Sequence, residues 1–458
     1  MTLSRRDLVL LGLSLVAIVP FFAADLVLST DLPQHLAHAA LAQRGTQPPF
    51  VVDLLPRPYL LSTHLLLALA PLGGLELAGR LALVVYALAL VLAFRAVIDS
   101  SPARDPRLVW LAPLFIQSWP VAYGFLPYLL GLPPILWALA AARGLRDRSS
   151  VLGIGQLVVA VVLAVYAHPL TGLLAFLLAQ TQLYDLPKVR RSPPLFFSAV
   201  GAAALGVSAV LARPPAAAIF ETDLGLVTWW RLSAKAKVLD FALAYLPGQW
   251  DLLLAAPALV ALLIALVRGR RGAKDPLDRA ALVIAGLYLV APADLALGGL
   301  HISLLGPRLV VLTWLLGVVA IRGPLPPFLP WAGAFSTLGL SVLLSLQARH
   351  YSERWSPPLR AALAAVPKGA VISAQVQKPA DPVLHPGLVG PPEGHLLQLA
   401  YLVGAQAVEG TFSTRQAPVW RTVRPVATLV WVQTATGTIE LRATEHDRRM
   451  KTSGPPEE

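Results

Sequence analysis

Apolar residues in this chain gather in long runs that are separated by short polar gaps. The runs lie near residues 8–28, 77–97, 108–120, 125–142, 151–167, 169–184, 195–212, 251–267, 280–298, 308–321 and 326–347. A stretch of about 20 apolar residues is long enough to cross a bilayer as a helix, and several runs approach that length. We therefore predict an α-helical polytopic membrane protein with about eleven transmembrane helices.

Two segments near the amino terminus allow other interpretations. The stretch from Pro58 to Leu72 is apolar but is broken by Pro71, and about 10–14 apolar residues are too few to span a membrane. We interpret it as a juxtamembrane or re-entrant helix within an external loop of about residues 29–76. The first run follows Arg5 and Arg6 and resembles a signal peptide, but it is long for one and lacks a clear cleavage site, which favours a retained helix.

Composition agrees with the membrane interpretation, because 56% of the residues are hydrophobic, 14% are charged, and the mean hydropathy is +0.66. A water-soluble domain cannot bury that much apolar surface. The net charge of +12 comes from cations in short gaps and not from one basic face or binding module, so nucleic acid is not an expected partner. The absence of cysteine excludes disulfides and thiol nucleophiles.

The positions of the cations predict the topology. If the helices alternate in direction, Arg5 and Arg6 share one side with five later gaps. Those gaps hold Arg95, Arg104 and Arg107; Arg143, Arg146 and Arg148; Lys188, Arg190 and Arg191; Arg268, Arg270, Arg271, Lys274 and Arg279; and Arg322. Cytoplasmic loops are rich in Lys and Arg. We expect a multi-pass protein of the bacterial inner (plasma) membrane, with a cytoplasmic amino terminus and an external, periplasmic carboxyl terminus.

The composition changes near residue 349, where Pro, Gly, Gln and charged residues mix with short strand-like runs such as 370–373 and 427–432. Between those runs, residues 394–404 have a helical pattern. We divide the chain into a transmembrane domain (1–348) with a long external loop at about 213–250, an external α/β domain (349–443), and a polar, disordered tail (444–458).

Several short motifs occur in an order that is typical of one group of membrane enzymes. Asp31 lies just after the first apolar run, and a proline-aromatic stretch, PRPYLLSTHL, follows at 56–65. An arginine-led helix starts at Gly79-Arg80, and YGFLPYLLGLP occupies 123–133. With an external carboxy-terminal domain, this layout resembles the GT-C superfamily of integral membrane glycosyltransferases, in particular an uncharacterised bacterial branch.

The resemblance implies a polyprenyl-phosphate-sugar donor whose head group enters from the external leaflet, and an inverting transfer to an acceptor that varies across the superfamily. It also implies that Asp31 acts as the catalytic base or as a metal ligand. The chain departs from the best-known members because it lacks a clear second acid beside Asp31 and the WWD-type signature of oligosaccharyltransferases. A divalent cation is therefore compatible with the sequence, with Asp31 as its ligand, but it is not indicated.

Asp31 and His35 are the candidate catalytic residues. Ionisable groups at the end of a membrane helix are costly and usually functional, and residues four apart share a helical face. Sugar transfer requires a base for the acceptor hydroxyl. The alternatives remain open: Asp31 is also suited to cap a helix that begins at Leu32-Pro33, and His35 to form an interfacial hydrogen bond. Asp25 is a secondary candidate that we expect to pair within the bundle.

Cationic and polar residues on the same side are candidates for binding the phosphate and sugar of the donor: Arg308, His301, Glu221, Asp223, Arg231 and Lys235. A guanidinium binds phosphate through two parallel hydrogen bonds. Arg308 is equally suited to be a snorkelling anchor, and Trp229 and Trp230 to form part of an interfacial aromatic belt. We interpret His64 and His168 as hydrogen-bonding or turn residues.

Two other functional classes remain open. A transporter or flippase would also have many helices, although transporters usually show repeated halves with broken helices at the membrane midplane. A non-catalytic membrane scaffold would use the external domain to bind a partner. The sequence contains no HExxH motif, nucleotide-binding loop or serine-hydrolase signature, which argues against a nucleotide-sugar donor.

Overall fold

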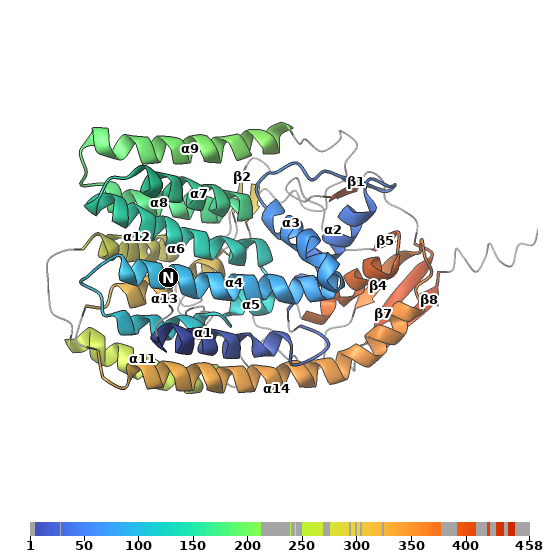
Figure 1. Ribbon diagram of the computed structural model, residues 1–458. Coiled ribbons are helices and arrows are strands. Elements are labelled where there is room, and N and C mark those ends of the chain that lie inside the picture. Colours follow the sequence, from blue (N-terminus) through green and yellow to red (C-terminus); the bar gives the residue numbers. More distant parts are fainter. Residues whose placement is uncertain are drawn as a thin grey trace, which may run out of the picture.

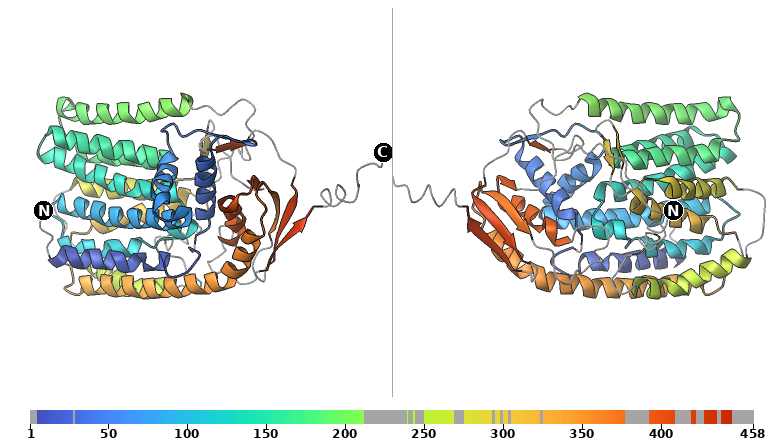
Figure 2. Two further views of the ribbon diagram at one scale, coloured as in Figure 1. Left: turned by 45° about the vertical axis from the view of Figure 1, so that its right-hand side comes forward. Right: turned by 180° about the vertical axis from the view of Figure 1, so that it is seen from behind.

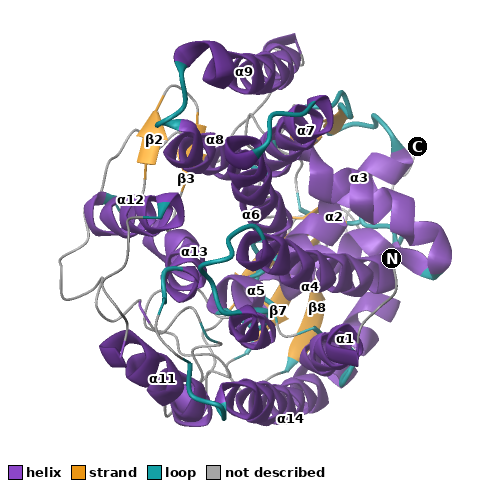
Figure 3. Cartoon of the chain, turned by 60° about the vertical axis from the view of Figure 1, so that its left-hand side comes forward, coloured by secondary structure: helices purple, strands orange, loops and turns teal. Residues whose placement is uncertain are grey.

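The protein is a bundle of helices with a small sheet at one end (Figure 1). The computed structural model describes residues 5–27, 29–211, 239, 243, 250–268, 275–292, 295–297, 300–302, 305–322, 325–376, 392–408, 419–421, 427–434 and 438–444. The long helices lie side by side, and Figure 3 views the bundle close to the helix axes. They are α1 (Arg5–Ile18), α4 (Gly74–Asp99), α6 (Leu126–Asp147), α7 (Val151–Ala167), α8 (Pro169–Leu183), α9 (Lys188–Leu211), α11 (Trp250–Arg268), α12 (Pro276–Val290), α13 (Leu305–Val319) and α14 (Leu329–Ala364).

Within the described part of the chain, three helices are long and apolar enough to cross a membrane: α4, α6 and α14. The predicted number of about eleven crossings is not confirmed. Proline explains one difference, because the run at 108–120 forms a ten-residue 3-10 helix, η3 (Pro106–Phe115), with Pro113 inside it, followed by the short α5 (Trp119–Tyr123). Proline lacks the backbone donor that an α-helix requires.

The apolar run at 280–298 also differs from its predicted helix. Helix α12 ends at Val290, and part of the remaining run forms the strand β2 (Leu295–Leu297), which pairs with β3 (Leu300–Ile302) in an antiparallel arrangement. At the amino terminus α1 ends at Ile18 and continues as the 3-10 helix η1 (Val19–Phe21), because Pro20 interrupts the α-helical bonding pattern.

Large apolar side chains cover the outer faces of the helices. Leu92, Leu253, Leu282 and Trp331 belong to four different helices, and each is more than 60% exposed. Soluble monomers rarely expose apolar surface so extensively. In contrast, α6 lies inside the bundle, because 83% of its most apolar stretch of 18 residues is buried. An apolar exterior around a packed centre is the arrangement expected of a helix bundle in lipid.

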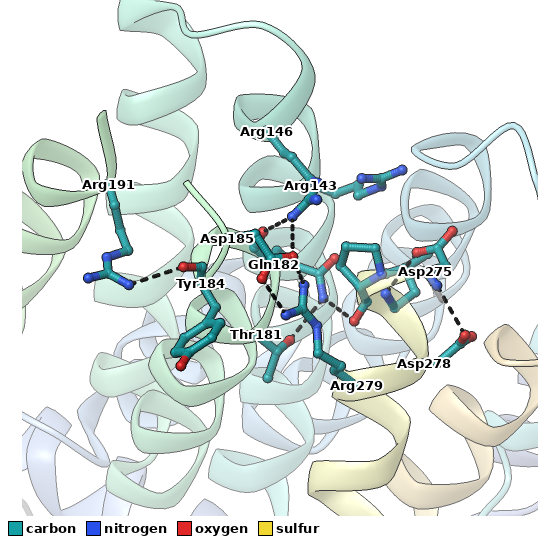
Figure 4. Close-up of polar contacts among 12 residues, drawn as sticks. Arg143, Arg146, Thr181, Gln182, Tyr184, Asp185, Arg191, Asp275, Asp278 and Arg279 are labelled. Atoms are coloured by element: carbon teal, nitrogen blue, oxygen red, sulfur yellow. Dashed lines mark hydrogen bonds and ion pairs between the residues drawn. The ribbon is translucent and has the colours of Figure 1, made fainter. Parts of the chain in front are cut away.

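Charged residues from four places in the sequence meet at one end of the bundle. Asp185, between α8 and α9, binds Arg146 of α6 (3.1 Å) and Arg279 of α12 (2.6 Å), and Figure 4 shows these side chains converging. The hydrogen bonds from Arg279 and then Arg146 lower the pKa of Asp185 to about 2. Buried Arg104 contacts Asp278 at 2.7 Å. We call this end of the bundle the cationic end.

The opposite end carries the remaining elements (Figure 2). Helix α2 (Leu32–Arg44), strand β1 (Phe50–Val52) and helix α3 (Leu60–Leu69) lie between α1 and α4 in the sequence. Helix α3 continues as the 3-10 helix η2 (Ala70–Leu72) and stops before Gly73, which has a φ of 158°. Ten α-helical residues agree with a helix that does not cross the membrane.

A mixed sheet follows α14. Its strand order is β5–β4–β7–β8, with β5 (Ala407–Val408) and β7 (Leu429–Gln433) parallel to the central β4 (Val371–Val376), and β8 (Ile439–Ala443) antiparallel to β7. The predicted strand runs fall on β4 and β7. The predicted helix at 394–404 is a 3-10 helix, η6 (Pro392–Val403). The proposed domain boundary at 348/349 falls within α14, and nearly all of the proposed tail lies outside the described residues.

The carboxy-terminal elements dock on the first long loop. Strand β6 (Val419–Arg421) pairs with β1, which joins residues that are far apart in the sequence. Arg44 donates to the carbonyls of Ala405 (2.7 Å) and Tyr401, and the Tyr401 ring packs edge-on against Phe50. The loop that carries Asp31 and the external domain predicted from the sequence therefore form one packed structure.

Candidate active site opposite the cationic end

Asp31 occupies the N-cap position of α2, but its carboxylate does not accept a hydrogen bond from the first turn of that helix. The backbone holds the residue in place instead. Asp31 N donates to Tyr123 O at 2.7 Å, and Thr30 N donates to Ala122 O at 3.1 Å. The side chain is partly exposed. The capping function considered for Asp31 as an alternative is therefore not used.

Gly124 allows this close approach. Its backbone has a φ of 88°, a left-handed conformation that glycine adopts without steric cost. A Cβ atom at this position would lie 2.4 Å from Ser29 Oγ, 2.7 Å from Leu32 N and 2.9 Å from Asp31 N. The glycine of the Tyr-Gly-Phe run therefore lies directly against the segment that carries Asp31.

His35 lies one turn along α2 from Asp31. Its ring hydrogen-bonds to the backbone of Gly124, and the ionisable groups that act on it are Asp31, His38 and Arg308. Burial is the largest effect and lowers the pKa of His35 from 6.5 to about 4. The imidazole is therefore neutral at physiological pH, so it can act as a hydrogen-bond donor or acceptor but carries no charge.

Arg308 reaches the same region from the first turn of α13. Its side chain is buried, and the guanidinium carbon lies 3.6 Å from the centre of the Phe125 ring and 5.6 Å from that of Tyr128. The charge of Arg308 interacts with Asp31, Tyr59, Tyr123 and Tyr128. A guanidinium stacked on aromatic rings inside a bundle differs from a snorkelling anchor, whose charge extends into the interface.

Tyr59 and His168 complete the aromatic surroundings of Arg308. The His168 ring lies 4.5 Å from that of Tyr59 and 6.0 Å from that of Tyr128, in edge-to-face contacts. We call these eight residues the Asp31–Arg308 cluster: Asp31, His35, Tyr59, Tyr123, Phe125, Tyr128, His168 and Arg308.

The predicted site residues are only partly described. The structure brings together Asp31, His35 and Arg308. The backbone of His301 pairs with that of Ala296 in the β2–β3 hairpin, and its side chain is not described. Glu221, Asp223, Arg231 and Lys235 lie outside the described residues. Asp25 accepts a hydrogen bond from Ser356 at 3.0 Å, as expected of a structural carboxylate.

Sequence reasoning gave no role to Tyr59, Tyr123, Phe125 and Tyr128, and it assigned His168 to a turn. The signal was present, since these tyrosines and Phe125 belong to the two aromatic motifs at 56–65 and 123–133. The sequence does not show that these residues share a neighbour, because Arg308 belongs to α13, which is far from both motifs in the sequence.

The cluster has a definite chemical composition. It contains a partly exposed carboxylate, a buried guanidinium, neutral histidine and tyrosine hydroxyls, which suit a proton acceptor and a set of donors for an oxyanion. Within the described residues, no group of three or more His, Cys, Asp or Glu side chains is placed to hold a metal ion. Asp31 remains the residue that would contribute to such a site.

No protein-family model, curated protein or solved structure matches this chain.

Proposed function

We propose that the chain is an integral membrane glycosyltransferase that moves a sugar from a polyprenyl-phosphate carrier to an acceptor hydroxyl on the external face of a bacterial inner membrane. The observation that carries the proposal is the meeting of Asp31 with Arg308, beside the Tyr-Gly-Phe run. A base for the acceptor and a cation for the departing phosphate are the two groups that such a transfer requires.

The position of the cluster supports an enzyme rather than a transporter. Its members lie at helix ends: Tyr128 near the start of α6, His168 between α7 and α8, and Arg308 in the first turn of α13. A transporter is expected to hold its polar groups near the membrane midplane. The charges that meet at the cationic end support a cytoplasmic location for that end, and the cluster then faces outward.

The proposed reaction is a single displacement. Asp31 accepts the proton of the acceptor hydroxyl, and the hydroxyl oxygen forms a bond to the anomeric carbon of the sugar. The bond from that carbon to the phosphate oxygen breaks, and its electron pair stays on the phosphate. Arg308 stabilises the charge that develops there. The configuration at the anomeric carbon inverts.

The test is sugar transfer in proteoliposomes that contain the full-length protein, labelled polyprenyl-phosphate sugars and extracted envelope acceptors. We expect transfer by the wild type and a loss of about 100-fold or more in Asp31→Asn, because a positioned base contributes about that much. Asp99→Asn is the matched control, since Asp99 is an exposed carboxylate on a neighbouring helix, paired with Arg95.

Three results would contradict the proposal or a part of it. Full activity in Asp31→Asn would remove Asp31 as the base. Equal losses in the Asp31 and Asp99 variants would indicate a general effect of lost charge. Movement of the labelled lipid across the bilayer without sugar transfer would identify a flippase instead.

A further inference from the structure

His168 has a fixed orientation and a fixed tautomer. Leu170 N donates to His168 Nδ1 at 3.1 Å, so that nitrogen carries no proton and the ring proton lies on Nε2. Thr171 Oγ1 donates to His168 O at 2.8 Å, and Gly172 N donates to the same carbonyl at 3.1 Å. The turn between α7 and α8 therefore presents a rigid, neutral Nε2–H donor.

Burial and, to a smaller extent, the charge of Arg308 lower the pKa of His168 well below 6.5, so the ring stays neutral. Burial likewise raises the pKa of Tyr59 to about 12, which keeps its hydroxyl protonated. Within the described part of the chain, neither His168 Nε2 nor the Tyr59 hydroxyl has a hydrogen-bond partner. Both donors are preserved and unused beside a buried cation.

Tyr59 is held in an unusual backbone conformation. Its φ of 75° and ψ of −12° are left-handed, and it is the one non-glycine residue with positive φ in the described ranges. Such a conformation is strained in a residue other than glycine and persists only where the surroundings require it. Here it accompanies the edge-on contact with His168 and the interaction with Arg308. A strained residue beside a buried guanidinium indicates a site that is organised in advance.

We propose that His168 and Tyr59 bind the phosphoryl oxygens of the substrate as neutral hydrogen-bond donors, beside the charged contact from Arg308. This inference rests on the proposed function and names its phosphate-binding residues. A phosphodiester has acceptor oxygens and one negative charge, so one cation with two neutral donors matches it in charge and in hydrogen-bonding capacity. The phosphomonoester that leaves carries more charge, and the same donors stabilise it.

Two substitutions at His168 test the roles of Nδ1 and Nε2 separately. His168→Asn keeps an oxygen that can accept from Leu170 N, as asparagine does at helix N-caps, and it removes the Nε2 donor. His168→Gln places its amide nitrogen near the position of Nε2 and loses the cap. Tyr59→Phe removes only a hydroxyl. His350→Asn and Tyr184→Phe are the controls, because both residues are exposed and neither belongs to the cluster.

The measurement is equilibrium binding, in detergent micelles, of undecaprenyl phosphate and of the uncharged alcohol undecaprenol. We expect His168→Asn and Tyr59→Phe each to weaken phosphate binding about tenfold, which is the value of one hydrogen bond to a charged group. Alcohol binding should not change. His168→Gln should bind phosphate better than His168→Asn, although it should unfold at a lower temperature.

Unchanged phosphate binding in these variants would overturn the inference, and so would equal losses for phosphate and alcohol, which would indicate a packing role only. The proposed function is tested separately by sugar transfer. A wild type that prefers the phosphate but transfers no sugar would refute the glycosyltransferase and leave this binding site intact. If the wild type transfers sugar but the three variants bind phosphate normally, the glycosyltransferase proposal stands and the phosphate-binding role of His168 and Tyr59 is refuted.

Discussion

The contact between Gly124 and the Asp31 segment can be tested by a single methyl group. Gly124→Ala introduces a Cβ 2.4 Å from Ser29 Oγ, 2.7 Å from Leu32 N and 2.9 Å from Asp31 N. All three distances are shorter than ordinary van der Waals contact. The Asp31 amide cannot move away without losing its 2.7 Å hydrogen bond to Tyr123 O.

Two costs contribute to the expected destabilisation. A left-handed conformation costs alanine about 1–2 kcal/mol relative to glycine. Forcing an extra carbon into a packed region adds about 1–3 kcal/mol. We therefore expect Gly124→Ala to lower the free energy of unfolding by about 2–5 kcal/mol, together with a loss of sugar transfer, since Asp31 must shift.

Gly74→Ala is the matched control. Its φ is 87°, almost equal to the 88° of Gly124, but a Cβ there has no atom within 4 Å. The control therefore carries the conformational cost alone, and the difference between the two variants measures the contact with the Asp31 segment. Unfolding in detergent, followed by heating or by denaturant, gives both values. If Gly74→Ala were as destabilising as Gly124→Ala, the close approach would be refuted.

A second variant identifies which atom resists the methyl group. Ser29 Oγ is the nearest atom and is buried without a hydrogen-bond partner in the described structure, so Ser29→Ala alone should cost little. The double variant with Gly124→Ala should recover part of the lost stability, because the two backbone nitrogens still crowd the methyl group. Strict additivity would show that the two positions do not touch.

Three further predictions concern the ends of the bundle and His35. The chain has no cysteine, so Gln47→Cys and Ser149→Cys, exposed at opposite ends, each provide a single labelling site. A membrane-impermeant maleimide should label Gln47→Cys in intact cells and Ser149→Cys only after permeabilisation, and the reverse pattern would invert the topology. Arg104→Ala should lower the free energy of unfolding by about 3–5 kcal/mol because it removes a buried guanidinium that lies 3.7 Å from the buried carboxylate of Asp275. Arg107→Ala, whose pair is exposed, should cost less than about 1 kcal/mol, and similar losses would contradict the buried position of Arg104. The pKa of His35 is lowered from 6.5 to about 4, so the unfolded chain binds its proton first, and stability should fall by up to about 3 kcal/mol as the pH drops from 6.5 to 4. His35→Gln should flatten that slope, and an unchanged slope would exclude His35 as its source.

The sequence predicted features that depend on local composition. Long apolar runs predicted the helix bundle, and the strand-like runs near residues 370 and 427 correspond to β4 and β7. The apolar pattern also predicted continuous helices where proline interrupts the segment, as at Pro113 in η3. Hydropathy measures the cost of burying a residue in lipid, whereas proline acts through a missing backbone donor, so a window of hydropathy does not detect the break.

The candidate site was predictable to the extent that its residues share a motif. Asp31 and His35 could be paired because helical spacing places them on one face. Their contact with the Tyr-Gly-Phe run depends on a backbone hydrogen bond between Asp31 and Tyr123, and any residue has the groups to form one. From the sequence, Arg308 was equally suited to be a snorkelling anchor or a phosphate-binding residue. Its packing against the Phe125 ring inside the bundle favours the second role.

His168 shows why the sequence predicts only a turn or hydrogen-bonding role for a residue that also has a candidate binding role. A histidine before proline at a helix start is suited to capping, and His168 does cap α8 through Nδ1. The side chain has a second polar atom, since accepting a hydrogen bond at Nδ1 places the single N–H proton of the neutral ring on Nε2. A structural hydrogen bond can therefore create a functional donor on the same ring. For a histidine at a helix end facing a buried cation, the useful question is which nitrogen the fold leaves available.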